Sequence, residues 1–311
     1  MDEPVQPGEE LVAGKLICVA CAASYIIQDH IPRFVDQKNY SESFGLQWNI
    51  FEKIQLDSYT GLPISRTRLQ EITNWPEELQ GSKILEAGSG AGRFTEVLLA
   101  MGASVFSFDY SSAVNANWLN NGKRENLNLF QGDIYNIPLP KASFDKVLCL
   151  GVLQHTPNPR KALLNLATYV RPGGQLVIDI YPKTWRGLLS WKYLLRPITK
   201  RLNARLLLKI IEHTVPILLP IAILLRKLFG GLGARLLPIV QYSHMGLPYK
   251  LNKQWAVLDT FDMYSPAYDH PASIATVKAW LKDAGLQNIE VKYGPNGIIG
   301  KGDAPRAIAR N

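Results

Sequence analysis

KILEAGSGAGRF, residues 83–94, combines a short apolar run, a glycine-rich turn and the start of an amphipathic segment. This order predicts a buried strand that turns sharply into a helix. Gly88, Gly90 and Gly92 allow the backbone to turn and to approach a ligand closely. Their spacing is G-x-G-x-G, whereas a dinucleotide pyrophosphate site has G-x-G-x-x-G. Alone, the turn fits a structural role as well as a cofactor loop.

Strand and helix patterns alternate after this turn. Helices are predicted from Phe94 to Met101 and from Pro159 to Val170, the second stopped by Arg171-Pro172-Gly173-Gly174. Strands are predicted at residues 83–87, 103–108, 128–131, 146–150 and 175–180. The alternation predicts an α/β fold with a Rossmann-like, doubly wound, mostly parallel sheet. Ligands of such sheets bind beyond the carboxyl ends of the strands.

Acidic side chains follow three of these strands in order. Glu86 ends the first strand, and Asp109 ends the second, where a carboxylate can accept both hydroxyls of a ribose. Asp133 follows the third strand and can accept from the exocyclic amine of an adenine, with Ile134 against the ring. Either aspartate alone is more simply a solvated loop residue. The ordered set of three favours a nucleoside-containing cofactor.

Four segments closely resemble the consecutive motifs of class I S-adenosylmethionine (SAM)-dependent methyltransferases. They are ILEAGSGAGRF (84–94), VFSFDYS (105–111), QGDIYNIPLPKASFDKVLCLGVLQHTPNP (131–159) and VRPGGQLVIDIY (170–181). The resemblance implies a SAM site in which Glu86 lies near the methionine amino group through the loop and water. It also implies that the following residues contact the cofactor: Gly88, Gly90, Gly92, Asp109, Tyr110, Asp133, Ile134, Gly151 and Val152.

The flanking segments resemble a bacterial methyltransferase subfamily with a small zinc ribbon at its N-terminus. The similar stretches are residues 16–34, 39–49 and 256–271. A structural zinc site needs four ligands, but only Cys18 and Cys21 are present. We therefore expect a degenerate ribbon without metal; a zinc shared across a dimer or completed by His30 is the alternative.

Candidates for chemistry lie on both sides of the predicted cofactor. His155 follows the fourth strand and suits a general base, although it can equally shape its loop by hydrogen bonding. Cys149 lies within that strand and is expected in the core. A helical stripe predicts a helix packed on the core, and the resemblance implies a lid, with Tyr40 or Gln47 reaching the methionine end: Tyr40, Phe44, Gln47 and Trp48. Candidates for the acceptor pocket, each more simply a surface or hydrogen-bonded residue, are His244, Asp259, Asp262, Tyr264 and Tyr268.

The excess positive charge is local. The chain has 311 residues and a net charge of +8, and Glu212 is the one acid between residues 183 and 235. The apolar run 214–225 is too short to span a bilayer, and Pro216 and Pro220 interrupt it. We expect a helical cap that closes an apolar pocket beside His155. Docking on an anionic membrane is one interpretation, and a packed subdomain with solvated cations is the simpler one. Nucleic acid is the less favoured partner, because the aromatic residues are not interleaved with the charges in a stacking pattern and no binding module is recognisable.

These patterns divide the chain into five predicted regions. They are a ribbon-like segment (1–38), a helical lid (39–80), a SAM-binding core (81–182), a helical cap (183–255) and a segment completing the sheet (256–311). Three cysteines make no disulfide scaffold, and the N-terminal acids Asp2, Glu3, Glu9 and Glu10 do not suit a signal peptide. We expect a cytoplasmic protein, and peripheral association with a membrane is the second interpretation.

The predicted activity is methyl transfer from SAM to a small or lipid-like acceptor, first at oxygen, then nitrogen, then carbon. A SAM-binding or membrane-associated accessory protein without turnover is the alternative from another class. An RNA methyltransferase is less favoured. Gly151-Val152-Leu153-Gln154 stands where an Asn/Asp-Pro-Pro-aromatic tetrad would mark methylation of a base amine.

Overall fold

The computed structural model describes residues 11–36, 39–184 and 190–306, and within them one sheet runs through the protein. Its strands are β1 (Ala13–Ile17), β2 (Ser24–Gln28), β3 (Ile31–Arg33), β4 (Lys83–Ala87), β5 (Ser104–Asp109), β6 (Leu127–Gln131), β7 (Phe144–Cys149), β8 (Val170–Ile180), β9 (Gln287–Gly294) and β10 (Gly297–Asp303). The helices are α1 (Glu42–Ile50), α2 (Asp57–Thr60), α3 (Ile64–Thr73), α4 (Arg93–Ala100), α5 (Val114–Asn121), η1 (Leu153–His155), α6 (Pro159–Ala167), α8 (Trp191–Thr199), α9 (Ala204–Gly233), η2 (Ser243–Met245), α10 (Tyr249–Tyr264) and α11 (Ile274–Asp283).

The strand order explains where a ligand can bind. It is β1-β2-β3-β6-β5-β4-β7-β8-β10-β9, and the pairs from β6 to β8 are parallel. The predicted Rossmann-like, mostly parallel sheet is therefore confirmed. The chain proceeds outward in one direction from β4 and in the other from β7. The loops after these two strands diverge, so the cleft between them is the topological switch point.

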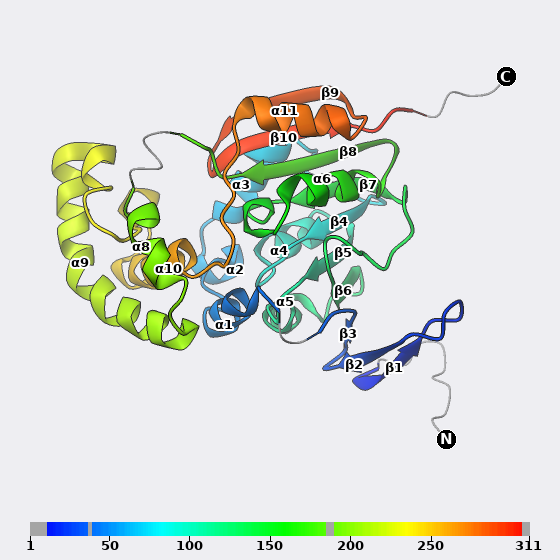
Figure 1. Cartoon of the computed structure of the whole chain (residues 1–311), viewed down its shortest axis with the longest axis horizontal. Coiled ribbons are helices and arrows are strands. Elements are labelled where there is room, and N and C mark those ends of the chain that lie inside the picture. The colour runs from blue at the N-terminus through cyan, green and yellow to red at the C-terminus, as the bar shows by residue number, and fades with distance from the viewer. Residues whose placement is uncertain (1–10, 37–38, 185–189, 307–311) are drawn as a thin grey trace.

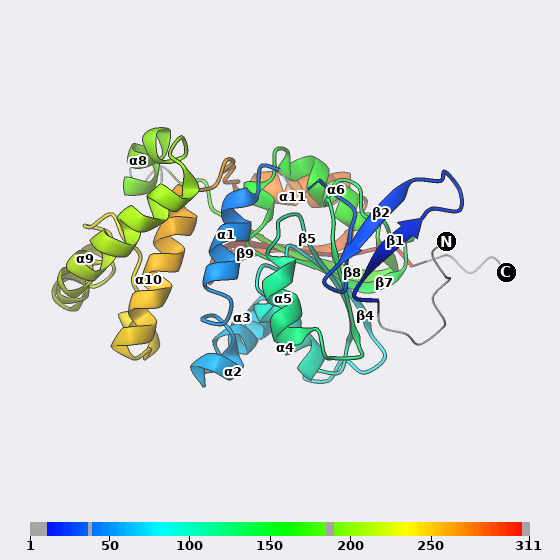
Figure 2. The same ribbon diagram turned by 90° about the horizontal axis from the view of Figure 1, so that it is seen from below.

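Helices cover both faces of the sheet (Figure 2). On one face α6 and α11 bury Leu163, Leu166 and Val277 against the strands. On the other face α3 and α4 bury Leu69 and Leu98. This sandwich fixes the strand ends on which the site is built.

A helical lobe of α8, α9 and α10 lies beyond the carboxyl ends of the strands (Figure 1). The apolar stripe of α9 packs on α10, where Val215 and Leu219 meet Ala256 and Phe261. The expectation that Pro216 and Pro220 interrupt this run is wrong. Both lie inside α9, which among the described residues is the one helix long and apolar enough to cross a membrane, by length and composition only. Packing against α10 stabilises the turns in which each proline removes a backbone hydrogen bond.

Two further boundaries differ from the predicted ones. Helix α6 ends at Ala167, and residues 171–174 are not a stop but lie within β8. Its register against β7 shifts there, because Phe144 pairs with Val170 whereas Lys146 pairs with Gln175.

Helix α10 crosses the predicted boundary at residues 255–256 because its buried side chains belong to the core of the helical lobe. The predictions for residues 1–10, 37–38, 185–189 and 307–311 lie outside the described residues.

The N-terminal strands extend one edge of the sheet. β1 and β2 form a hairpin, and β3 joins β6. Cys18 and Cys21 lie at one end of β2 with free thiols, and His30 lies at the other end, stacked on Trp118. This separation places His30 apart from the cysteine pair, and the described residues contain no group of three or more ligands suited to a metal ion.

Candidate functional site

A cavity of about 810 Å³ opens at the carboxyl ends of β4 and β7, within the size range of small-molecule sites. Its wall is mainly apolar and combines the switch-point loops with α1, α3, α8 and α10. Predicted residues on the wall are Tyr40, Phe44, Trp48, Gly88, Gly90, Asp109, Tyr110, Ile134, Gly151, Val152, His155, Asp259 and Asp262. Predicted residues outside the wall are Gln47, Glu86, Gly92, Asp133, His244, Tyr264 and Tyr268.

The glycine loop is held against the strand ends by close backbone contacts. The Gly88 amide donates to the Phe108 carbonyl at 2.8 Å, and Gly88 has φ +78°. A Cβ at Gly88 would lie 2.2 Å from Cγ2 of Val152, and one at Gly90 would lie 3.1 Å from the Trp48 ring. Glycine is therefore required at position 88 by conformation and by space. The loop leaves its backbone open to the cavity.

Asp109 connects this loop to the end of β5. Its Oδ2 accepts from the Gly90 amide at 3.0 Å, and its Oδ1 accepts from the amide and hydroxyl of Ser111 at 2.8 and 2.7 Å. Burial raises the pKa of Asp109, while these hydrogen bonds oppose the rise. A carboxylate has about four lone-pair positions, so room remains for a ligand hydroxyl.

Glu86 supports the glycine loop through α4 and β5, and it is not among the residues that line the cavity. Its Oε2 accepts from Thr95 Oγ1 at 2.5 Å and from Ser107 Oγ at 2.8 Å. Burial raises the pKa of Glu86 to about 7. Glu86 therefore ties α4 to β5, and its predicted approach to the methionine amino group, through the loop and water, stays a prediction.

Three other predicted residues are also set back from the cavity. Gly92 is the residue that precedes α4, with φ +87°, and a Cβ there would lie 2.2 Å from Oδ1 of Asn117. Asp133 accepts from the Tyr135 amide at 2.9 Å. Gln47 is fully buried, and its Nε2 lies 3.5 Å from Oδ1 of Asp262. These residues support the walls that their neighbours form.

His155 lies in η1, directly after the β7 loop, and its ring is enclosed by aromatic side chains. Its Nδ1 lies 3.1 Å from the carbonyl oxygen of Tyr268, which fixes Nδ1 as the protonated nitrogen. Its Nε2 is buried and has no hydrogen-bond partner among the described residues. Phe44 and Tyr181 pack against the ring at centroid distances of 5.1 and 5.5 Å. Burial lowers the pKa of His155, so the neutral imidazole is favoured.

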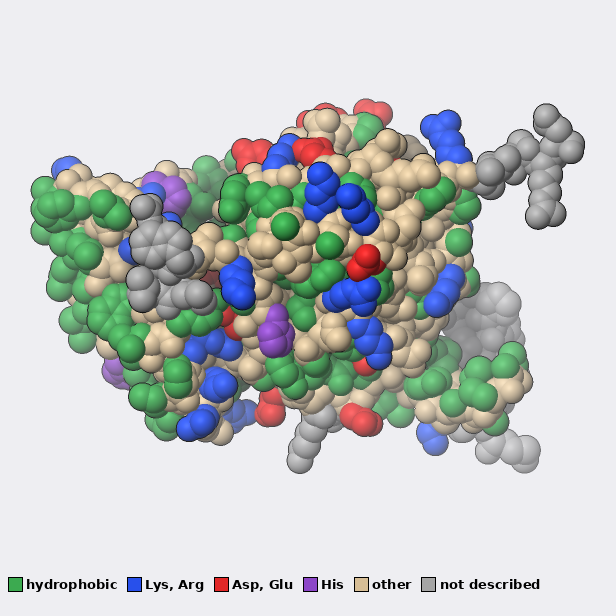
Figure 3. Space-filling view, turned by 45° about the horizontal axis from the view of Figure 1, so that its top comes forward, with side chains coloured by type: hydrophobic (Ala, Val, Ile, Leu, Met, Phe, Trp, Pro, Cys, Tyr) green, Lys and Arg blue, Asp and Glu red, His purple; other side chains and the backbone are tan. Residues whose placement is uncertain are grey.

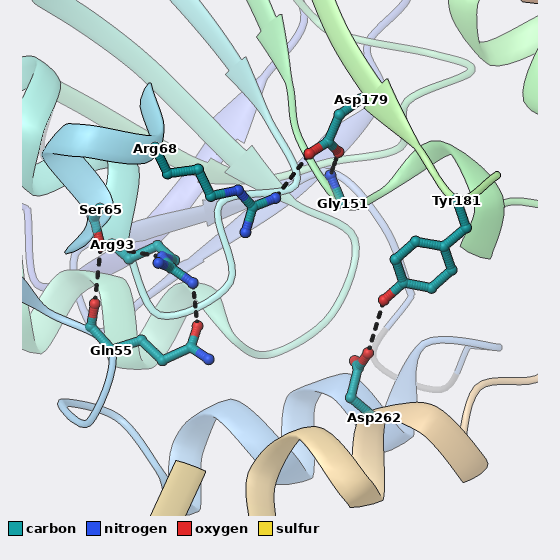
Figure 4. A network of polar contacts seen from close by, with 8 residues as sticks. All are labelled: Gln55, Ser65, Arg68, Arg93, Gly151, Asp179, Tyr181 and Asp262. Atoms are coloured by element: carbon teal, nitrogen blue, oxygen red, sulfur yellow. Dashed lines mark hydrogen bonds and ion pairs between the residues drawn. The ribbon is translucent and has the colours of Figure 1, made fainter. Parts of the chain in front are cut away.

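The sequence patterns missed a network of polar groups around Arg68, Arg93 and Asp179 (Figure 4). Arg68 of α3 contacts Asp179 at 2.7 Å, and the other oxygen of Asp179 accepts from the Gly151 amide. Arg93 donates to Gln55 at 2.7 Å, and burial lowers the pKa of Arg93 to about 10. Two signals were available. An acid stands inside the apolar run of β8, and an arginine directly follows the glycine motif.

Another side of the cavity carries paired carboxylates and phenols. Tyr181 donates to Asp262 at 3.4 Å, and Tyr242 donates to Asp259. Burial raises the pKa of Asp259 to about 6. Lys192 of α8 contacts Asp269 at 2.7 Å and lies over the Tyr181 ring at 4.4 Å.

Three residues predicted for the acceptor pocket do not line the cavity, and each contacts other residues instead. Tyr264 donates to the Pro238 carbonyl at 3.0 Å, and His244 stacks on Tyr242 with ring centroids 6.2 Å apart. Tyr268 holds His155 through its carbonyl, and its ring packs edge-on against Tyr40. Cys149 is fully buried in the core, as predicted.

Comparison with known proteins matches the central part of the chain. A family model described as a methyltransferase domain matches residues 85–178. The ubiquinone biosynthesis O-methyltransferase of Coxiella burnetii is 30% identical over 122 residues, which cover 39% of this chain and 50% of that protein. The mitochondrial enzyme of the same name from Schizosaccharomyces pombe is 32% identical over 132 residues, covering 39% and 47%. The chain thus spans about half the length of the curated relatives it matches.

Solved structures resemble the fold more distantly. A putative methyltransferase complexed with the Trm112 activator of Haloferax volcanii has a TM-score of 0.49 at 12% identity, covering 85% of this chain and 98% of its own. Human N-acetylserotonin methyltransferase in complex with SAM has a TM-score of 0.48 at 12% identity, covering 87% and 60%. The family match coincides with the glycine loop and the strand ends described above, so residues 85–178 match a methyltransferase domain.

Proposed function

We propose that this chain transfers a methyl group from SAM to a hydroxyl oxygen of a small, largely apolar acceptor. The observation that carries the proposal is the state of His155. His155 lines the cavity, its Nδ1 is bound to a backbone carbonyl, and its Nε2 is buried without a hydrogen-bond partner among the described residues. A neutral imidazole held in this way is suited to take a proton.

The residues on one side of the cavity have the chemistry to hold SAM. The glycine loop leaves a cradle at Gly88 that a Cβ would fill. Asp109 retains acceptor capacity for ribose hydroxyls, and Ile134 offers an apolar surface for adenine. Arg68 places a cation on the wall beside Gly151, suited to a methionine carboxylate. When bound, SAM supplies an electrophilic methyl group on its sulfonium.

The acceptor side favours an aromatic hydroxyl compound. Tyr40, Phe44 and Tyr181 line the cavity around His155 and provide flat apolar surfaces. Asp262 adds a polar anchor that a second hydroxyl of the acceptor can contact. The curated relatives are named as O-methyltransferases of ubiquinone biosynthesis, which supports oxygen as the target atom.

His155 would act at one defined atom. As the acceptor oxygen gains the methyl group and the carbon–sulfur bond breaks, the hydroxyl proton passes to Nε2. The carbonyl of Tyr268 stabilises the resulting imidazolium through Nδ1–H. The surrounding aromatic rings exclude water from this transfer.

The test uses the purified full chain, SAM and alkyl-substituted catechols, with methylated product measured by mass spectrometry. His155→Asn retains a donor for the Tyr268 carbonyl but removes the base. We expect turnover to fall about 100-fold or more while SAM affinity stays within about twofold. His270→Asn, an exposed histidine outside the cavity, is the matched control.

The pH profile separates a base from a structural residue. Because burial lowers the pKa of His155 below its ordinary value, kcat/KM should rise with pH through that lowered pKa and then reach a plateau. Full turnover in His155→Asn would contradict the base. Methylation of amines but of no hydroxyl compound would contradict oxygen as the target.

A further inference from the structure

The side of α9 that faces away from α10 is apolar and uncovered. We call it the α9 outer face and define it as Leu206, Ile210, Ile217, Ile221, Leu224 and Leu228. Ile217 is 69% exposed and Leu228 is 63% exposed. Figure 3 shows hydrophobic side chains gathered over this lobe. Soluble monomers rarely expose a continuous apolar strip of this kind, so it indicates an interaction surface.

The opposite stripe of the same helix already has a partner within the chain. Leu207, Ile211, Val215 and Leu219 are buried in the cluster shared with α10. Helix α9 therefore has two apolar sides, of which one packs on the protein and the other is exposed. The packing holds α9 on the lobe and leaves the outer face available to an external apolar phase.

Cations surround this face with almost no opposing charge. The exposed basic residues between positions 190 and 240 are Lys200, Arg201, Arg205, Lys209, Lys227 and Arg235. Glu212 is the one acid in that range. Within the described part of the chain, none of these six cations forms an ion pair. They flank the uncharged centre of α9, from Val215 to Leu225, on both sides along the sequence.

We propose that the α9 outer face docks on the surface of an anionic lipid bilayer. Exposed aliphatic side chains would enter the boundary between headgroups and acyl chains, and the flanking cations would contact acidic headgroups. An apolar protein partner would not require six exposed cations beside a single acid. A membrane span would have to separate α9 from α10 and expose Val215 and Leu219, which the packing opposes.

Docking would place the acceptor cavity beside the lipid. Lys192 of α8 and Val240 and Tyr242 just after α9 line the cavity wall, so the same segment forms the lobe and the acceptor side. An acceptor dissolved in the membrane would then have a short path to His155. The docking itself does not depend on the proposed activity, since it rests on the exposed face and its charges.

The test measures co-sedimentation of the full chain with vesicles. We expect binding to phosphatidylcholine vesicles that contain about 30 mol % phosphatidylglycerol, weak binding to pure phosphatidylcholine, and a loss of binding as salt rises. Replacing Ile217, Leu224 and Leu228 together by Ser should weaken binding at least about 50-fold. Replacing Lys200, Lys209 and Lys227 by Gln should weaken it about 20-fold or more.

Matched triple variants on other surfaces control for general effects. Ile17, Val19 and Leu119 are exposed apolar residues away from the lobe, and their replacement by Ser should leave binding unchanged. Lys123, Lys278 and Lys282 serve likewise for charge, by replacement with Gln. SAM affinity measured by calorimetry in every variant shows that the cofactor domain remains folded.

Three outcomes would overturn the proposal. The first is absence of binding to the anionic vesicles, or equal loss of binding in the control variants. The second is a dimer that the Ile217, Leu224 and Leu228 triple variant converts to a monomer, which would assign the face to a second copy of the chain. The third is retention in the membrane after alkaline carbonate extraction, which would indicate a spanning helix.

Discussion

Replacing Gly88 by Ala tests the geometry of the cofactor loop most directly. Gly88 has φ +78°, a conformation in which a side chain costs about 1–2 kcal/mol. The added Cβ would also meet Cγ2 of Val152 at 2.2 Å and Cγ1 at 2.9 Å, and such overpacking costs about 1–3 kcal/mol. We expect Gly88→Ala to lower the free energy of unfolding by about 2–5 kcal/mol.

Val152→Ala separates the two contributions. It removes both Cγ atoms and leaves the Val152 Cβ at 3.1 Å from the added Cβ. In the double variant it should therefore remove the free-energy cost of overpacking but leave the conformational cost. Urea unfolding of the wild type, both single variants and the double variant forms a double-mutant cycle. We expect a favourable coupling energy of about 1–3 kcal/mol. SAM affinity, measured in parallel by calorimetry, should recover partly in the double variant.

Gly61→Ala is the matched control, because Gly61 has φ +70° and no atom lies within 4 Å of its added Cβ. It should cost only the conformational part and show no coupling to Val152→Ala. The reasoning is refuted if Gly88→Ala costs no more than Gly61→Ala. It is equally refuted if the cycle is additive to within about 0.5 kcal/mol.

Two further predictions concern the acids near the loop. Asp109→Asn should weaken SAM binding in calorimetry about 10- to 100-fold, because hydrogen bonds to a charged group contribute about 1.5–3 kcal/mol; unchanged affinity would remove Asp109 from the ribose site. The folded-state pKa of Glu86 is about 7, above its ordinary value of 4.5, so the folded state holds this proton more tightly than the unfolded chain. Stability contributed by the protonated group should therefore fall as pH rises from about 4.5 to about 7, by up to about 3 kcal/mol, and urea unfolding of Glu86→Gln should lack this decrease. An identical pH dependence in the variant would contradict the buried environment of Glu86.

The parallel core of the fold was predictable because its signals are local. Short apolar runs bounded by glycine and acids mark β4 to β7 to within about two residues. The prediction that residues 171–174 stop a helix was wrong, because proline and glycine occur at a register shift inside a strand as readily as at the end of a helix. Pro216 and Pro220 misled in the same way, since tertiary packing on α10 outweighs their local cost.

The side-chain arrangement of the site was less predictable because it depends on contacts between distant segments. Glu86 alternates with Leu85 and Ala87 along β4, so its carboxylate faces Thr95 on α4 and not the cavity. Arg68 meets Asp179 across 111 residues of sequence, and no local pattern announces that pair. The position of Asp109 was predictable because an acid at the end of the strand that follows the glycine loop has a fixed place in the sheet.

The residues of the cavity fall into two groups, those inside the family match and those outside it. The family match ends at residue 178, directly before Asp179, whose carboxylate links the Gly151 amide to Arg68. Residues up to that point build the cofactor loop from local sequence. Other parts of the cavity wall come from α1, α3, α8 and α10, which lie outside the matched range. Because Asp179 joins the two parts, displacement of α3 would be transmitted to the β7 loop that carries His155. The proposed acceptor pocket therefore draws on segments that lie outside the family match.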